Sequence, residues 1–179
     1  RLYQLSSQPT EQNQKDDRFY SHFTVKLIKA EALLDAIDQA TESQTKYKNL
    51  PLGTRAIELP DAEYPNVFLN TFGKPRRSSV CECERSVDQT LVSTLHIVNG
   101  ETISSKLSDK NGRVTRLTAA KTPVKEFIEE LFLATWCRKP TAEELQVAQQ
   151  FVSKQPDQQA GLADLLWVLI SSKNFLYVN

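Results

Sequence analysis

The sequence predicts a mainly helical fold with a minor, short β element. Three segments in the last third of the chain carry apolar residues at the three- and four-residue spacing of amphipathic helices. Breaks at Pro140 and Pro156 separate these segments, so short turns should join them. Patterns typical of strands are brief and confined to the first third of the chain. We therefore expect an irregular helical region over residues 1–121 and a three-helix bundle over residues 122–179, packed together as one domain.

Each helix of the expected bundle has a recognisable start. Thr122 is a suitable cap for the first helix, and Pro123 suits its first position because proline lacks the N–H that would be unpaired there. Thr141 and Glu144 have the spacing of a capping box, which starts the second helix. The third helix opens at Pro156-Asp157. The apolar stripes of these helices are interpreted as core.

The elements of the first part are shorter. Residues 30–41 predict one amphipathic helix, with four apolar side chains on its buried face. The alternating segment TRAIEL predicts a strand over residues 54–59, which could pair with residues 2–5. Further helices are expected over residues 65–71, from Ser86 to Val98, over 101–107 and around Val114 to Ala120.

Composition limits the classes of function. The chain has 179 residues, is 40% hydrophobic and 25% charged, and has a formal net charge of zero. Such neutrality argues against binding to nucleic acid or to an anionic membrane surface. No apolar run is long enough for a transmembrane helix, so we expect no membrane insertion. The chain begins at Arg1 and contains no methionine, which we interpret as a fragment of a larger protein.

A Cys-Glu-Cys-Glu-Arg segment is the most distinctive feature of the chain. If it is extended, the thiols of Cys81 and Cys83 lie on one face, and the carboxylates of Glu82 and Glu84 on the other. Two thiolates could bind a soft metal or undergo redox chemistry, but a closed zinc site needs four ligands. The alternative is a pair of small thiols packed as apolar groups.

Basic residues surround this segment. Arg76, Arg77 and Arg85 could pair with the neighbouring carboxylates. The result is either a pocket for an anion or a sugar acid, or a polar brace that holds a long loop. His96 lies at the border of an apolar stripe, where it is either a hydrogen-bonded rim residue or a functional group.

Two further residues complete the candidate set. Arg55 lies within the predicted strand and Asp61 follows it, and they could form a carbohydrate site together with the cysteine segment and His96. Glycoside hydrolysis requires only two carboxylates, so composition does not exclude it. The cluster Asp16-Asp17-Arg18 could be a binding point, but it is more typical of a solvated turn with aromatic anchors.

The segment FLNTFGKPRRSSVCECERS, followed by LHIVNG, resembles domain of unknown function 1553, also called planctomycete-specific domain one. RLYQLSS, DDRFYSHF, AEALLDAIDQAT and GTRAIELPD extend the resemblance towards the start of the chain. LFLATWCRKPTAEEL and DLLWVLISSKNFLYVN extend it to the end. In this copy Lys74 stands where an arginine is more usual.

The resemblance implies an exported, multi-domain protein, often with a cytochrome-like module elsewhere, and hence a periplasmic or cell-surface location. No Cys-x-x-Cys-His motif occurs, so we expect no cofactor in this segment and any haem elsewhere in the parent chain. Our first hypothesis is a non-catalytic interaction or scaffold module that contacts other domains of its parent chain. The alternatives are part of an enzyme acting on complex carbohydrate, and a metal or redox site at Cys81 and Cys83.

Overall fold

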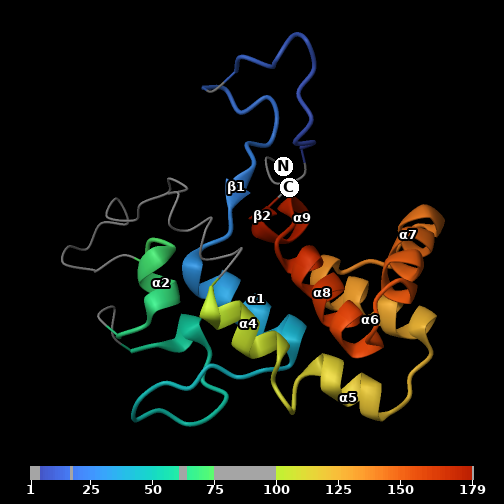
Figure 1. The fold of residues 1–179 in the computed structure, drawn as a ribbon. Coiled ribbons are helices and arrows are strands. Elements are labelled where there is room, and N and C mark those ends of the chain that lie inside the picture. Colours follow the sequence, from blue (N-terminus) through green and yellow to red (C-terminus); the bar gives the residue numbers. More distant parts are fainter. Residues whose placement is uncertain (1–4, 17, 61–63, 75–99, 179) are drawn as a thin grey trace.

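Helix α1 (Ala30–Thr41) lies at the centre of the first part of the chain (Figure 1). The computed structural model describes residues 5–16, 18–60, 64–74 and 100–178. Leu33, Leu34 and Ile37 recur on one face of α1, and all three are buried. Several neighbouring elements pack against this stripe. Their packing removes the apolar face of α1 from water, which is favourable.

In the part of the chain that the structure describes, four short helices pack against α1. Their bounds are η2 (Ala56–Glu58), a single 3₁₀ turn, α2 (Val67–Thr71), α4 (Glu101–Leu107) and α5 (Arg113–Ala119), and each contacts α1. Helix α4 has the predicted bounds, whereas α2 begins two residues later than predicted. Asn66 caps α2 by accepting a hydrogen bond from the N–H of Leu69. The predicted helix from Ser86 to Val98 lies outside the described residues.

Three longer helices follow, α6 (Val124–Trp136), α7 (Ala142–Ser153) and α8 (Gln158–Ile170), and each contacts the other two. The capping box is confirmed, since the N–H of Glu144 donates to Thr141 Oγ1 at 3.2 Å. Asp157 caps α8. The cap predicted at Thr122 is wrong by one residue, because Pro123 takes that position. Helix α8 also packs against α1, α4 and α5.

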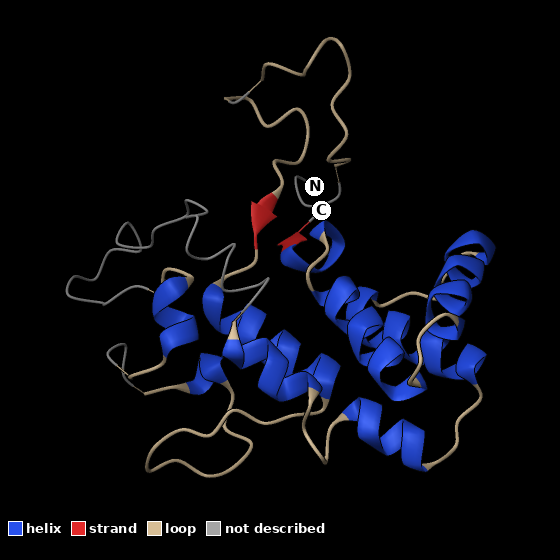
Figure 2. Ribbon diagram, viewed as in Figure 1, coloured by secondary structure: helices blue, strands red, loops and turns tan. Residues whose placement is uncertain are grey.

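The small sheet is not where the sequence placed it. Strand β1 (Lys26–Leu27) pairs in antiparallel fashion with β2 (Tyr177–Val178), which follows the short helix α9 (Lys173–Leu176) (Figure 2). The strand predicted over residues 54–59 is wrong. The carboxylates of Asp35 and Glu58 accept the N–H groups of this segment, so it closes a 3₁₀ turn. Over the described residues, the fold class is confirmed as mainly helical with one two-stranded antiparallel sheet.

A long loop precedes β1 and projects away from the helices (Figure 1). Among the described helices, none has both the length and the apolar character that crossing a membrane requires.

Candidate functional site

Most of the predicted site residues lie outside the part of the chain that the structure describes. These are Asp61, Arg76, Arg77, Cys81, Glu82, Cys83, Glu84, Arg85 and His96. Their roles in a metal, redox or carbohydrate site remain predictions. Arg55 is described, and it lies at the edge of a cavity that runs along α1.

The cavity along α1, called here the α1 cleft, has a volume of about 790 Å³. Asp35 and Asp38 line it from one face of α1, because they are three residues apart, and Glu42 lines it from the C-cap position just after the helix. Arg55 and Arg113 line it from two other segments. The segments that close over this face of α1 could not be predicted from local spacing.

Asp35 fixes the 3₁₀ turn η2 to α1. Its carboxylate accepts hydrogen bonds from the N–H groups of Ala56 at 2.6 Å and Ile57 at 3.2 Å. Burial raises the pKa of Asp35 above its usual value, and the two N–H donors offset only part of this effect. Beside it, Arg55 donates to Glu58 at 2.9 Å. The predicted site residue Arg55 is therefore engaged within its own turn.

Asp38 forms a buried ion pair with Lys106 of α4, whose side chain is only 9% exposed. The ammonium group of Lys106 also donates to the hydroxyl of Thr45 at 2.9 Å and to that of Ser43 at 3.4 Å. The N–H of Thr45 donates to Asp38 at 2.8 Å. Because each charged group has several partners, the cluster can tolerate burial. Its geometry joins α1, α4 and the intervening loop.

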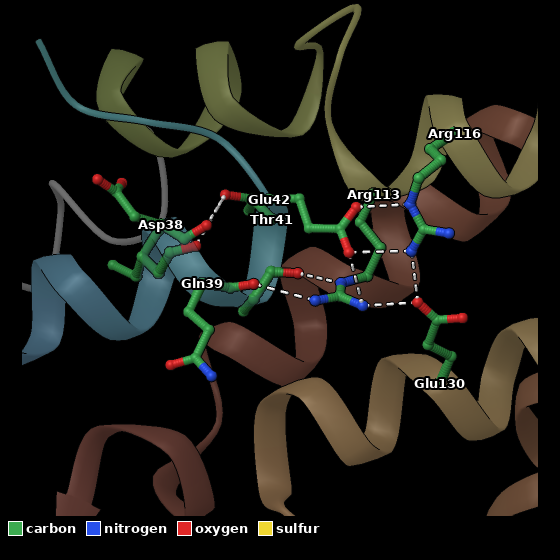
Figure 3. A network of polar contacts seen from close by, with 9 residues as sticks. Asp38, Gln39, Thr41, Glu42, Arg113, Arg116 and Glu130 are labelled. Atoms are coloured by element: carbon green, nitrogen blue, oxygen red, sulfur yellow. Dashed lines mark hydrogen bonds and ion pairs between the residues drawn. The ribbon is translucent and has the colours of Figure 1, made fainter. Parts of the chain in front are cut away.

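Two arginines of α5, Arg113 and Arg116, form a polar network with the end of α1 (Figure 3), and Arg113 also lines the α1 cleft. The guanidinium of Arg113 donates to the carbonyl oxygens of Ala40 at 2.8 Å and Gln39 at 3.0 Å, which lie in the last turn of α1. It also pairs with Glu130 of α6 at 2.6 Å and with Glu42 at 3.2 Å. The carbonyls at the end of a helix lack partners within it. Arg113 therefore acts as a distant C-cap for α1.

Arg116 completes this network from the next turn of α5. Its two nitrogens bind Glu42 at 2.7 and 2.9 Å, and one of them also binds Glu130 at 2.7 Å. The guanidinium of Arg116, followed by the charge of Arg113, lowers the pKa of Glu42. Two arginines thus face two carboxylates, and the network joins α1, α5 and α6.

The described residues include no group of three or more histidine, cysteine or acidic side chains arranged to hold a metal ion. The α1 cleft presents both signs of charge, with carboxylates that already accept hydrogen bonds from the chain itself. Its charged groups position helices relative to one another.

The family model of the protein of unknown function DUF1553, also labelled PSD1, matches residues 1–152. The chain belongs to the DUF1553 family. This confirms the resemblance seen in the sequence. No curated protein and no solved structure matches the chain significantly.

A second concavity in this DUF1553 chain is apolar. It has a volume of about 560 Å³ and lies between α6, α7 and α8; we call it the bundle groove. Its apolar lining consists of Phe132, Trp136, Val147, Ala148, Phe151, Leu165, Val168 and Leu169. Val147 is 66% exposed, and Phe151 and Val168 are also exposed. Phe151 was predicted to belong to the core, so its exposure is a correction.

Polar groups hold the walls of the bundle groove. Trp136 Nε1 donates to the hydroxyl of Ser172 at 3.0 Å, which joins the end of α6 to the end of α8. The guanidinium of Arg138 lies 5.0 Å from the ring centroid of Trp136, within the range of a cation–π contact. Arg138 also pairs with Glu144 at 2.7 Å. The groove therefore has a fixed shape although its apolar surface is open.

Acid is expected to weaken the start of α7. Hydrogen bonds from Arg138, and then from the N–H of Thr141, lower the pKa of Glu144 from 4.5 to about 2. Because the folded-state pKa is the lower one, ionised Glu144 stabilises the fold above about pH 4.5, and this is lost as the pH falls towards 2. The contribution should be of the order of 1 kcal/mol, since the pair is partly exposed.

Urea unfolding of Glu144→Gln between pH 6 and pH 3, at roughly half-unit steps, measures this effect. The variant should lose stability less steeply with acid than the wild type, whereas the exposed neighbour variant Glu143→Gln should follow the wild type. If the free energy of unfolding fell equally steeply with pH for Glu144→Gln and the wild type, Glu144 would not be the source of the acid effect.

Proposed function

We propose that this DUF1553 chain is a non-catalytic interaction or scaffold module of a larger exported protein linked to a cytochrome. The bundle groove is the observation that carries this proposal. An interaction module needs a surface that gains free energy when another protein covers it, and exposed apolar side chains provide that gain.

The arrangement of the groove supports a docking role. Val147, Phe151 and Val168 are exposed within a single concave surface, whose lining also includes the buried ring of Phe132 and the half-buried ring of Trp136. Exposed apolar residues that are scattered singly are ordinary, whereas a concave group with aromatic walls is typical of a protein-binding surface. The partner proposed here is a protein segment with an apolar anchor.

The α1 cleft supports the non-catalytic part of the proposal. Asp35 and Asp38 accept hydrogen bonds from the chain's own N–H groups, and Glu42 binds two arginines. A general acid or base must be within hydrogen-bonding reach of a substrate proton. Here the carboxylates bind backbone and guanidinium groups, which is the use expected of structural braces.

A photo-cross-linking amino acid at Val147 tests the proposal in the full-length protein that contains this chain. We expect irradiation to join residue 147 to another protein segment, which mass spectrometry can identify. The same amino acid at Gln146 is the matched control, because Gln146 is exposed on α7 but does not line the groove. Equal, background-level cross-linking at both positions would refute the docking role.

A further inference from the structure

We propose that Asn111 deamidates to isoaspartate when the turn between α4 and α5 opens, and that this modification separates α5 from the end of α1. In this turn Asn111 is followed directly by Gly112, the residue before α5. The proposal does not depend on the docking role of the bundle groove, whose lining includes neither residue.

The Asn-Gly pair supplies both reacting groups. Asparagine followed by glycine is prone to deamidation, because the nucleophile is the main-chain nitrogen of the next residue and glycine has no Cβ to hinder it. The nitrogen of Gly112 gives up its proton to a base and attacks Cγ of Asn111. A C–N bond forms, the side-chain nitrogen leaves as ammonia, and the product is a cyclic succinimide. Asn111 is exposed, so water has access to this ring.

Water opens the succinimide in one of two ways. Breaking the new bond between the Gly112 nitrogen and Cγ gives aspartate, with the main chain unchanged. Breaking the original peptide bond instead leaves the main chain running through Cβ and Cγ of residue 111, which is isoaspartate. Either product consumes water and releases ammonia. The isoaspartate main chain is longer by one C–C bond, about 1.5 Å.

Gly112 stands where the fold has no room for a side chain. It is buried, and a Cβ there would lie 3.1 Å from the carbonyl oxygen of Thr41 and 3.2 Å from that of Asp109. Glycine therefore allows the start of α5 to approach the end of α1 closely. The packing that requires glycine at this position also keeps the reactive pair in the chain.

The lengthened main chain would act on the contacts of Arg113. Gly112 is the N-cap of α5, and Arg113 is its first residue. The guanidinium of Arg113 donates to two carbonyl oxygens in the last turn of α1 at 2.8 and 3.0 Å (Figure 3). Such bonds span only about 2.7–3.2 Å between nitrogen and oxygen, so a change of about 1.5 Å in the main chain breaks this fit.

The turn slows the reaction while it stays closed. The N–H of Gly112 donates to the carbonyl oxygen of Asp109 at 3.0 Å, and the N–H of Asn111 donates to the Asp109 carboxylate at 2.9 Å. Aspartate in the first position and glycine in the fourth are typical of such a turn. The Gly112 nitrogen must leave its acceptor before it attacks, so the rate depends on how often the turn opens.

Ageing of the folded chain at mildly alkaline pH tests the reaction. Mass spectrometry of its peptides detects the change from amide to acid, and enzymatic methylation detects isoaspartate. We expect conversion at Asn111 but little at Asn49 and Asn174, which are exposed and are followed by larger side chains. A protease that cleaves after Glu101 separates Asn111 from Asn99, which lies outside the described residues.

Two variants of Asp109 test the control by the turn. Asp109→Ala removes the acceptor for the N–H of Asn111 and should speed conversion about fivefold, as expected for the loss of one hydrogen bond. Asp109→Asn has the same charge as Asp109→Ala but keeps an oxygen acceptor, and should convert at the wild-type rate. Conversion of Asn111 no faster than that of Asn49, or equal rates for the two variants, would overturn the proposal.

Urea unfolding of the aged chain tests the structural consequence. Ion exchange isolates the modified chain by its new negative charge, and methylation gives its content of isoaspartate. This chain should unfold at a lower urea concentration than the wild type, and the shift should be smaller in Arg113→Ala, where the contact is already lost. Asn111→Asp is the matched control, because it adds the same charge with a normal main chain; it should unfold like the wild type. An isoaspartate-containing chain that unfolds like Asn111→Asp would overturn the separation of α5 from α1.

Discussion

Shortening the chain to residues 1–152, the stretch matched by the family model, is expected to prevent cooperative folding. The shortened chain lacks α8, α9 and β2, which contribute seven buried apolar side chains: Leu162, Leu165, Leu166, Leu169, Ile170, Phe175 and Leu176. At about 1.5–3 kcal/mol for each buried side chain, their loss removes about 10–20 kcal/mol, which is as large as or larger than the roughly 5–15 kcal/mol by which domains are stable.

Thermal unfolding followed by circular dichroism measures this effect. The 1–152 chain should show no sharp transition and should bind a dye that reports exposed apolar surface. A chain lacking residues 1–24 is the control, because most of the described residues removed are exposed and belong to the projecting loop. It should unfold cooperatively. A sharp transition for the 1–152 chain would show that α8 is dispensable to the core.

The second large effect is expected for Arg113→Ala, which should lower the free energy of unfolding by about 3–4 kcal/mol. The substitution removes donors from the carbonyl oxygens of Gln39 and Ala40 and leaves Glu42 and Glu130 with one arginine fewer. The side chain of Arg113 is only 12% exposed, so water replaces its hydrogen bonds poorly. Urea unfolding at neutral pH provides the measurement.

Two variants isolate the cause. Arg116→Ala removes an arginine from the same network, but that side chain is 49% exposed, so its loss should cost about 1 kcal/mol or less. Arg113→Lys keeps the charge but lacks the planar group that reaches two carbonyls and two carboxylates. Its free energy of unfolding should therefore lie between those of the wild type and Arg113→Ala. Equal costs for Arg113→Ala and Arg116→Ala would contradict the capping role.

Local patterns predicted most of the helices because the physical causes of these helices are local. The apolar stripe of α1 and the capping box of Thr141 and Glu144 lie within a few residues, and both are confirmed. The predicted strand at residues 54–59 failed because its N–H groups bind Asp35, about 20 positions earlier, and Glu58. An alternating apolar pattern over only six residues is weak evidence for a strand when carboxylate side chains can accept hydrogen bonds from the same N–H groups.

In the candidate sites, too, features with local causes could be predicted and features that join distant segments could not. Arg55 was singled out from the sequence, but its partner Glu58 makes it part of a turn. Arg113 binds the carbonyl oxygens at the end of α1, more than 70 positions earlier in the chain. The local spacing of residues could not predict this contact. The bundle groove depends on how three helices pack. The apolar stripes of the sequence predicted Phe151 to be in the core and gave no sign that it would remain exposed.

The pairing of β1 with β2 has a consequence for synthesis of the protein. Lys26 lies opposite Val178, so β1 is completed by residues that are made roughly 150 positions later in the chain. Helix α1 also packs against α8, which is synthesised well after α1. Contacts between such distant positions form slowly, because long segments must first be brought together. The nascent chain must therefore hold its early helices with apolar surface uncovered until α8 and β2 have been made, and chaperones would engage it during that interval.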